Sequence, residues 1–142
     1  MSIQTYTTTG MGFDANRMPF FKFNNFCKNH LDAVKQLGLA KDLKVALAEG
    51  WCKEDIEDLT NLHTLTEIVA EVMKIETGIE FEAAVGDEGE EAILFVPWYP
   101  WDYNEVERSL TADQLIKIMS DYASEIMSEK PFVGITTVHW SC

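Results

Sequence analysis

The sequence has no Lys, Arg or His between residues 75 and 107, although that stretch contains ten carboxylates. They belong to Glu76, Glu80, Glu82, Asp87, Glu88, Glu90, Glu91, Asp102, Glu105 and Glu107, and no residue nearby in the sequence neutralises them. The 142-residue chain has a net charge of −13. A field of one sign repels nucleic acid and anionic lipid and attracts basic protein surfaces. We therefore expect a partner protein with a basic, nucleic-acid-binding surface, and no direct contact with nucleic acid or membrane.

Cysteines are few and irregularly spaced. Cys27, Cys52 and Cys142 form no Cys-x-x-Cys pair and are odd in number, which predicts free thiols in a reducing compartment. No apolar run approaches the roughly 18 residues of a membrane span, and the first residues lack the charged and apolar regions of a signal peptide. We therefore expect a cytoplasmic protein.

Signatures of catalysis and of cofactor binding are absent from the sequence as well. It has no Gly-x-Gly-x-x-Gly fingerprint, no Gly-x-Ser-x-Gly elbow and no calcium-binding loop. Cys27 and His30 lie three residues apart, but no spacing supplies the two further ligands of a tetrahedral metal site. We predict that the protein is not an enzyme and holds no cofactor or metal, with Cys27 in the core and His30 half-exposed.

The apolar residues that are present recur mainly at helical spacing in the first half of the chain. The predicted elements are a Thr- and Tyr-rich strand over residues 3–13 and helices over residues 19–38, 39–50 and about 53–77. Thr64 and Glu67 match a capping box. The third helical stretch is therefore either one helix or two helices that meet near His63.

After Gly78 the spacing of apolar residues changes to a period of two, which is typical of a strand. Gly86 and Gly89 then supply a turn before an apolar run without alternation, so we expect a hairpin whose second arm is central and covered on both faces. Thr111 and Gln114 form another capping box. The predicted elements are strands over residues 79–85 and 92–97, a helix over residues 111–130 and a strand over residues 132–140.

No repeat, low-complexity tract or flexible linker divides the sequence. The order of elements is strand, three or four helices, two strands, helix and strand (β-ααα-ββ-α-β). It predicts a single α+β domain over residues 1–142, with an antiparallel four-stranded sheet and helices packed on one face.

The acidic residues of the predicted hairpin allow two interpretations. One is a solvated sheet face whose charges serve solubility. The other is imitation of nucleic acid, because alternate residues on a strand face lie about 6.6 Å apart, close to the phosphate spacing along one DNA strand. The candidate partner-binding carboxylates are Glu80, Glu82, Asp87, Glu88, Glu90 and Glu91, joined by Asp102, Glu105 and Glu107.

Four large aromatic side chains lie within residues 97–103, a segment stiffened by two prolines. One interpretation is a lid whose rings cover the open edge of the core. In that case Trp101, which heads back toward the next helix, contributes more to stability than Trp98. The other is a partner-binding patch of Trp98, Tyr99 and Trp101, since Trp and Tyr dominate interface hot spots and a stiff loop loses little entropy on binding.

One segment carries a resemblance to known proteins. In residues 92–134 an apolar strand runs into Pro97-Trp98-Tyr99-Pro100-Trp101, Ser109-Leu110-Thr111 opens a helix, and a Pro-led strand follows. This segment, together with Gly10-Met11-Gly12-Phe13, resembles small uncharacterised proteins of phages and mobile elements of Gram-positive bacteria, although Trp98 stands where a small residue is expected. Many small acidic phage proteins inhibit bacterial defence systems, so the resemblance implies an inhibitor and assigns no site residue.

Two functional hypotheses follow. The first is a non-catalytic acidic inhibitor, similar to an anti-CRISPR protein, that acts in the host cytoplasm on a CRISPR effector or another defence nuclease by DNA mimicry or occlusion of a basic groove. The second is a small structural or regulatory phage protein that binds its partner through the aromatic loop at residues 98–103. The dependence of binding affinity on ionic strength distinguishes the two hypotheses. Binding by charge weakens steeply as ionic strength rises, whereas binding through an aromatic anchor changes little.

Overall fold

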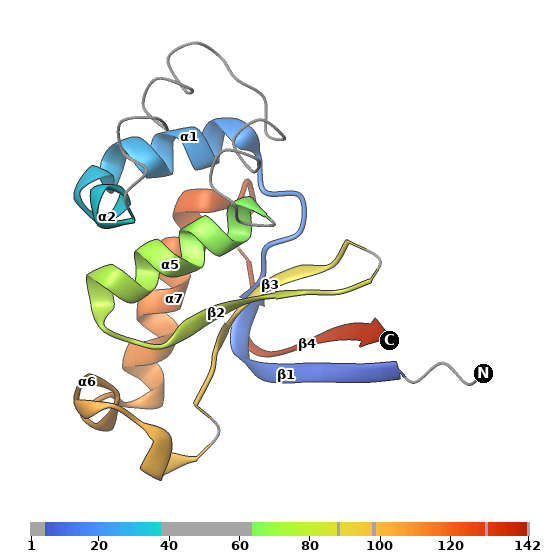
Figure 1. The fold of residues 1–142 in the computed structure, drawn as a ribbon, viewed down its shortest axis with the longest axis vertical. Helices are drawn as coiled ribbons and strands as arrows, with labels where there is room; N and C mark the ends of the chain where they lie inside the picture. The colour runs from blue at the N-terminus through green and yellow to red at the C-terminus, as the bar shows by residue number, and fades with distance from the viewer. Residues whose placement is uncertain (1–4, 38–63, 88, 98, 130, 142) are drawn as a thin grey trace.

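The computed structural model describes residues 5–37, 64–87, 89–97, 99–129 and 131–141, and its four strands form one antiparallel sheet in the order β2-β3-β1-β4 (Figure 1). The elements are β1 (Thr5–Asp14), α1 (Phe20–Asn29), α2 (Leu31–Gln36), α5 (Leu65–Thr77), β2 (Phe81–Val85), β3 (Glu91–Phe95), the 3₁₀ helix η1 (Pro100–Asp102), α6 (Glu105–Arg108), α7 (Ala112–Ile126) and β4 (Val133–Ser141). The prediction of an α+β fold with a four-stranded antiparallel sheet is confirmed.

Local caps define the two long helices. The Thr64 hydroxyl accepts the N–H of Glu67 at 3.3 Å at the start of α5, which ends at Gly78 with a left-handed φ of 73°. Thr111 and Gln114 form a reciprocal capping box at the start of α7. Such caps contribute about 1 kcal/mol each because they satisfy backbone groups that have no partner within the helix. Both starts agree with the prediction from sequence.

The single helix predicted over residues 19–38 is wrong, because the helix breaks at His30. The backbone of His30 has φ −118° and ψ 36°, which is not helical, and separates α1 from α2. Contacts to two other helices, described below, hold the His30 ring. The spacing of apolar residues along the sequence does not indicate these contacts. The helices predicted between residues 39 and 63 lie outside the described residues.

The main core lies between one face of the sheet and the helices α1, α2, α5 and α7 (Figure 1). Phe13 from β1, Ile93 from β3, Phe23 from α1 and Met119 from α7 are fully buried in it. On β3, Ala92, Ile93 and Leu94 are all buried, which confirms that the second arm of the hairpin is covered on both faces. Val85, the last residue of β2, is 43% exposed.

A second, smaller core forms on the other face of the sheet. Val138 of β4 packs there against Ala92 and Leu94, with Ala84 at its margin. Gly12 lets β1 approach β3 closely, because a Cβ at that position would lie only 2.1 Å from the Ile93 carbonyl oxygen. β1 pairs with β3 over Gly12–Asp14, and the ribbon of β1 and β4 lies beside the hairpin of β2 and β3 (Figure 1).

Candidate protein-binding surface

The acidic residues of the hairpin lie along its whole length. Glu80 precedes β2, Glu82 lies within it, and Asp87 lies in the turn, and all three side chains are exposed. Glu90 and Glu91, at the start of the second arm, are partly buried. Glu88 lies outside the described residues.

Two of these carboxylates have partners inside the protein, and the expectation that no base neutralises the acidic stretch is wrong for Glu80. Lys74, one residue before the base-free stretch, places its Nζ 3.1 Å from Oε2 of Glu80. That hydrogen bond and the charge of Glu80 raise the pKa of Lys74. A carboxylate oxygen of Glu90 accepts the backbone N–H of His139 at 3.2 Å.

Glu107 is structural and not part of an acidic surface. Its side chain is only 2% exposed, and its two carboxylate oxygens accept the backbone N–H groups of Glu80 at 2.7 Å and Asn104 at 2.8 Å. The side-chain oxygen of Asn104 in turn accepts the Glu107 N–H, which completes a capping box at the start of α6. Glu107 therefore ties α6 to the start of β2.

The aromatic loop and the hairpin turn lie at opposite ends of the hairpin (Figure 1). At one end the Val96 N–H donates to the Glu80 carbonyl at 3.1 Å, and the chain continues into the aromatic loop. At the other end the Asp87 N–H donates to the His139 carbonyl at 3.2 Å, so the turn contacts β4. The candidate residues predicted from the sequence therefore lie on two separate surfaces. We call the hairpin turn together with Glu82 the acidic surface; the other is the aromatic loop together with Asp102.

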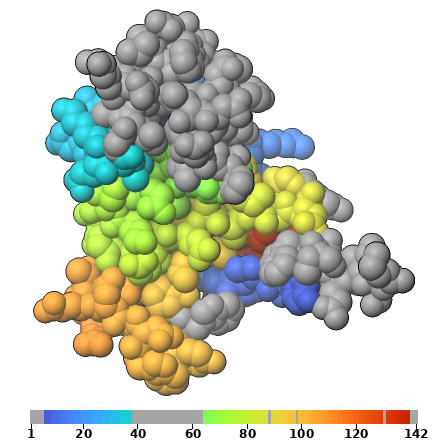
Figure 2. Space-filling model, in the orientation of Figure 1, coloured from blue at the N-terminus to red at the C-terminus, as the bar shows by residue number. Residues whose placement is uncertain are grey.

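Tyr99 and Trp101 form a stacked pair on the outside of the protein. Their ring centroids lie 4.6 Å apart with an interplanar angle of 3°. The side chains are 54% and 73% exposed. The lid interpretation is therefore wrong for these two rings. In the space-filling view the orange surface of η1 and α6 projects from the body of the protein (Figure 2).

The base of this loop is ordered by contacts to the body. Pro100 opens η1, in which the Asp102 N–H donates to the Tyr99 carbonyl at 2.9 Å. Tyr103, partly buried, packs its ring edge-on against Phe95 at the end of β3, with centroids 5.5 Å apart. The ring of Tyr103 therefore packs against the body of the protein through Phe95, while Trp98 lies outside the described residues.

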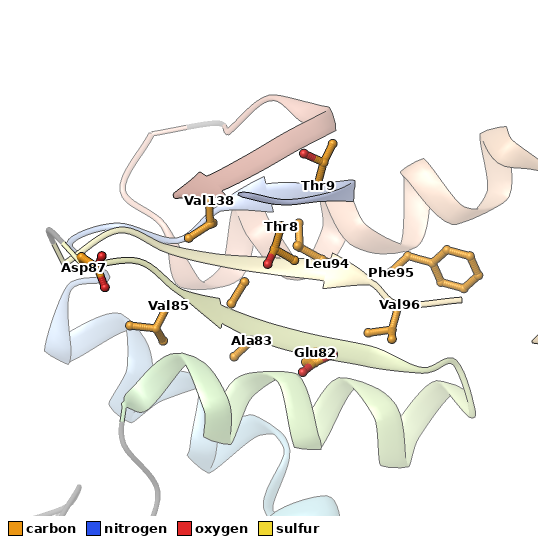
Figure 3. A pocket seen from close by; sticks show the side chains of 11 residues that line it. Thr8, Thr9, Glu82, Ala83, Val85, Asp87, Leu94, Phe95, Val96 and Val138 are labelled. Atoms are coloured by element: carbon orange, nitrogen blue, oxygen red, sulfur yellow. The ribbon is translucent and has the colours of Figure 1, made fainter. Parts of the chain in front are cut away.

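A hollow opens between the hairpin and the ribbon of β1 and β4 (Figure 3). Its volume is about 450 Å³, and Leu94 and Val138 form an apolar wall. Thr8, Glu82 and Asp87 add polar groups around it. The hollow lies beside the acidic surface, because Glu82 and Asp87 belong to both. Among the described residues that line it, no nucleophile is paired with a base.

Sequence reasoning missed a cluster of titratable side chains around His30. Nδ1 of His30 lies 2.7 Å from Glu76 on α5, and Nε2 lies 2.9 Å from both carboxylate oxygens of Glu125 on α7. Tyr122 donates its hydroxyl to Glu76 at 2.7 Å. Ionised carboxylates only accept, so the contacts to both ring nitrogens form together when each nitrogen carries a proton, as in an imidazolium. The partners are 46 and 95 residues away in sequence, and no local pattern indicates them.

Burial alone would lower the pKa of His30, but its hydrogen bonds to Glu76 and Glu125 and their charges raise it above its ordinary value. The pKa of Tyr122 is raised as well, by burial first and then by Glu76. Because both ring nitrogens bind carboxylates, the ring offers no nitrogen to a metal. Cys27 is buried, and burial raises the pKa of its thiol to about 12, whereas Cys52 and Cys142 lie outside the described residues.

Within the described part of the chain, no group of three or more His, Cys, Asp or Glu side chains could hold a metal ion, and no helix is long and apolar enough to cross a membrane. The resemblance to phage proteins stays a prediction, since no protein-family model, curated protein or solved structure matches this chain.

Proposed function

We propose that this protein is a non-catalytic binding protein that holds its partner through the aromatic loop, with Tyr99 and Trp101 as the anchor. The observation that carries the proposal is the stacked pair itself, two large rings exposed together on a loop whose base is fixed. Exposed apolar groups scattered singly are ordinary on a protein surface. Two rings held parallel at the tip of a projection form a larger continuous apolar surface, which a partner can cover.

The physical properties of the loop suit this role. The two rings already stack on each other in the free protein, so their parallel arrangement exists before the partner arrives. Pro100 and the hydrogen bond from Asp102 to Tyr99 restrict the backbone between the rings. Binding then costs little conformational entropy, and Trp and Tyr are the residues that most often dominate binding energy.

A second candidate function uses the acidic surface. Glu82 and Asp87 are exposed on a hydrogen-bonded hairpin, and a rigid array of carboxylates suits the basic groove of a nucleic-acid-binding protein. In its most specific form, this candidate is a phage or mobile-element inhibitor that occludes such a groove on a host defence nuclease in the cytoplasm. Glu82 and Asp87, whose side chains are both exposed, are the residues with which to test it.

Affinity capture from a lysate of candidate host cells, followed by quantitative mass spectrometry, separates the two functions. The double variant Tyr99→Ala with Trp101→Ala should lose the captured partner, whereas Phe21→Ala, at a ring 63% exposed on α1, should retain it. Capture should also persist at high salt. If the double variant captures the same protein as the parent while Glu82→Lys with Asp87→Lys loses it, the aromatic proposal is wrong and the acidic surface is the site.

A further inference from the structure

We infer that the stacked pair takes an arginine side chain of the partner, which lies on an open ring face and donates to the carboxylates beside it. This inference rests on the proposed function and names the chemistry of its contact. Each ring gives one face to the other ring, so the faces that remain for a partner are the outer ones. With 73% of its side chain exposed, Trp101 offers the larger open surface.

The charge around the rings selects a cation. Asp102 lies on the same 3₁₀ turn as Trp101, and Glu105 is the first residue of α6; both side chains are exposed. The chain has no Lys, Arg or His from residue 75 to residue 107, Lys74 before this stretch is engaged with Glu80, and Arg108 after it is at the end of α6. An apolar ligand would desolvate these carboxylates without pairing them, which is costly. A cation pairs with them and is also attracted by the negative ring face of Trp.

The shape of the surface favours arginine over lysine. A guanidinium is planar, so it stacks on an indole while its N–H groups donate in the plane to a carboxylate. The ammonium group of lysine is a compact, strongly hydrated charge that cannot lie flat on a ring. A stacked pair with adjacent carboxylates therefore matches the guanidinium in both geometry and charge.

The test uses the full-length ¹⁵N-labelled protein and three short peptides in which glycine alternates with arginine, with lysine or with citrulline, the neutral isostere of arginine. The indole N–H signal of Trp101, assigned with Trp101→Phe, should shift saturably with the arginine peptide, with affinity in the millimolar range. The lysine peptide should bind about threefold more weakly, because it lacks the bidentate, planar contact. The citrulline peptide should give no saturable shift.

Matched variants separate this contact from general attraction to an acidic protein. Asp102→Asn should weaken the arginine peptide about two- to fivefold, the size of an exposed charge contact. Asp32→Asn, the same chemical change at an exposed position of α2, should leave the affinity unchanged. Equal affinities for arginine and lysine peptides, equal effects of the two substitutions, or no saturable shift would each overturn the arginine assignment.

The two proposals fail in distinguishable ways. If the Tyr99→Ala, Trp101→Ala variant loses the captured partner but the arginine peptide does not bind, the aromatic loop is the binding site and arginine is the wrong ligand. If the double variant keeps its partner, the proposed function itself is wrong.

Discussion

Single residues of the aromatic loop divide into those that face solvent and those that support the fold. We expect Trp101→Ala to leave the free energy of unfolding within about 0.5 kcal/mol of the parent, as for other exposed positions, because the side chain is 73% exposed. Tyr103→Ala should cost about 1 kcal/mol or more, since its ring packs edge-on against Phe95. Urea denaturation of both variants measures the difference. A larger loss for Trp101→Ala would restore the lid interpretation.

Glu107 is the carboxylate on which the loop depends most. Glu107→Ala removes the acceptor of two backbone N–H groups in a place where water cannot replace it. Leaving buried donors unsatisfied costs about 1–3 kcal/mol, so the midpoint of denaturation should fall clearly. Glu105→Ala, at an exposed position two residues earlier, is the matched control and should change stability little. Similar losses for both variants would show that burial does not decide the role of Glu107.

Among the elements, the junction of α1 and α2 depends on protonation of His30. Its raised pKa means that the contribution of Glu76 and Glu125 is fully present below the ordinary histidine pKa of about 6.5 and is lost as the pH rises through the folded-state value. We expect the parent to lose stability over that interval and His30→Gln to lose less. Thermal melts between slightly acidic and alkaline pH measure this. His139→Gln, at the exposed histidine of β4, should follow the parent, and an unchanged profile for His30→Gln would contradict the prediction.

Elements defined by neighbouring residues could be predicted from the sequence, and those defined by distant contacts could not. The caps at Thr64 and Thr111 join residues three positions apart, so both helix starts were readable. Asn104 and Glu107 carry the same kind of signal at the start of α6, but the aromatic composition around them predicts only a loop. The break at His30 has no such signal, because the partners of its ring come from two other helices.

The candidate site was predicted in composition but not in arrangement. The sequence indicated both the acidic hairpin and the aromatic loop, because charge and ring content are visible residue by residue. It could not indicate that the ring pair faces outward or that Lys74 pairs with Glu80, since both depend on how β3 and α5 pack in three dimensions.

On the scale of the whole molecule, the net charge of −13 opposes a compact state through self-repulsion. Glu82 on β2 lines the same surface hollow as Glu67 and Glu71 on α5, and the charges of Glu71 and Glu82 also act on Lys74. We expect Glu82→Lys to leave the melting temperature unchanged or raise it at low salt, and to reduce the gain in stability that added salt gives the parent. Calorimetry at two ionic strengths measures this. A clear loss of stability would mean that Glu82 makes a favourable contact in the fold.

The two ends of the aromatic loop meet at one residue. The Glu80 carbonyl accepts from Val96 before the loop, and the Glu80 N–H donates to Glu107 after it. These two bonds close the loop through Glu80, Val96 and Glu107, so its closure does not depend on which side chains stand at its tip. Since lengthening an already closed loop costs little entropy, other sequences can lie between the same two attachments while the sheet below stays the same. Under the proposed function, such substitutions at the tip would change the partner.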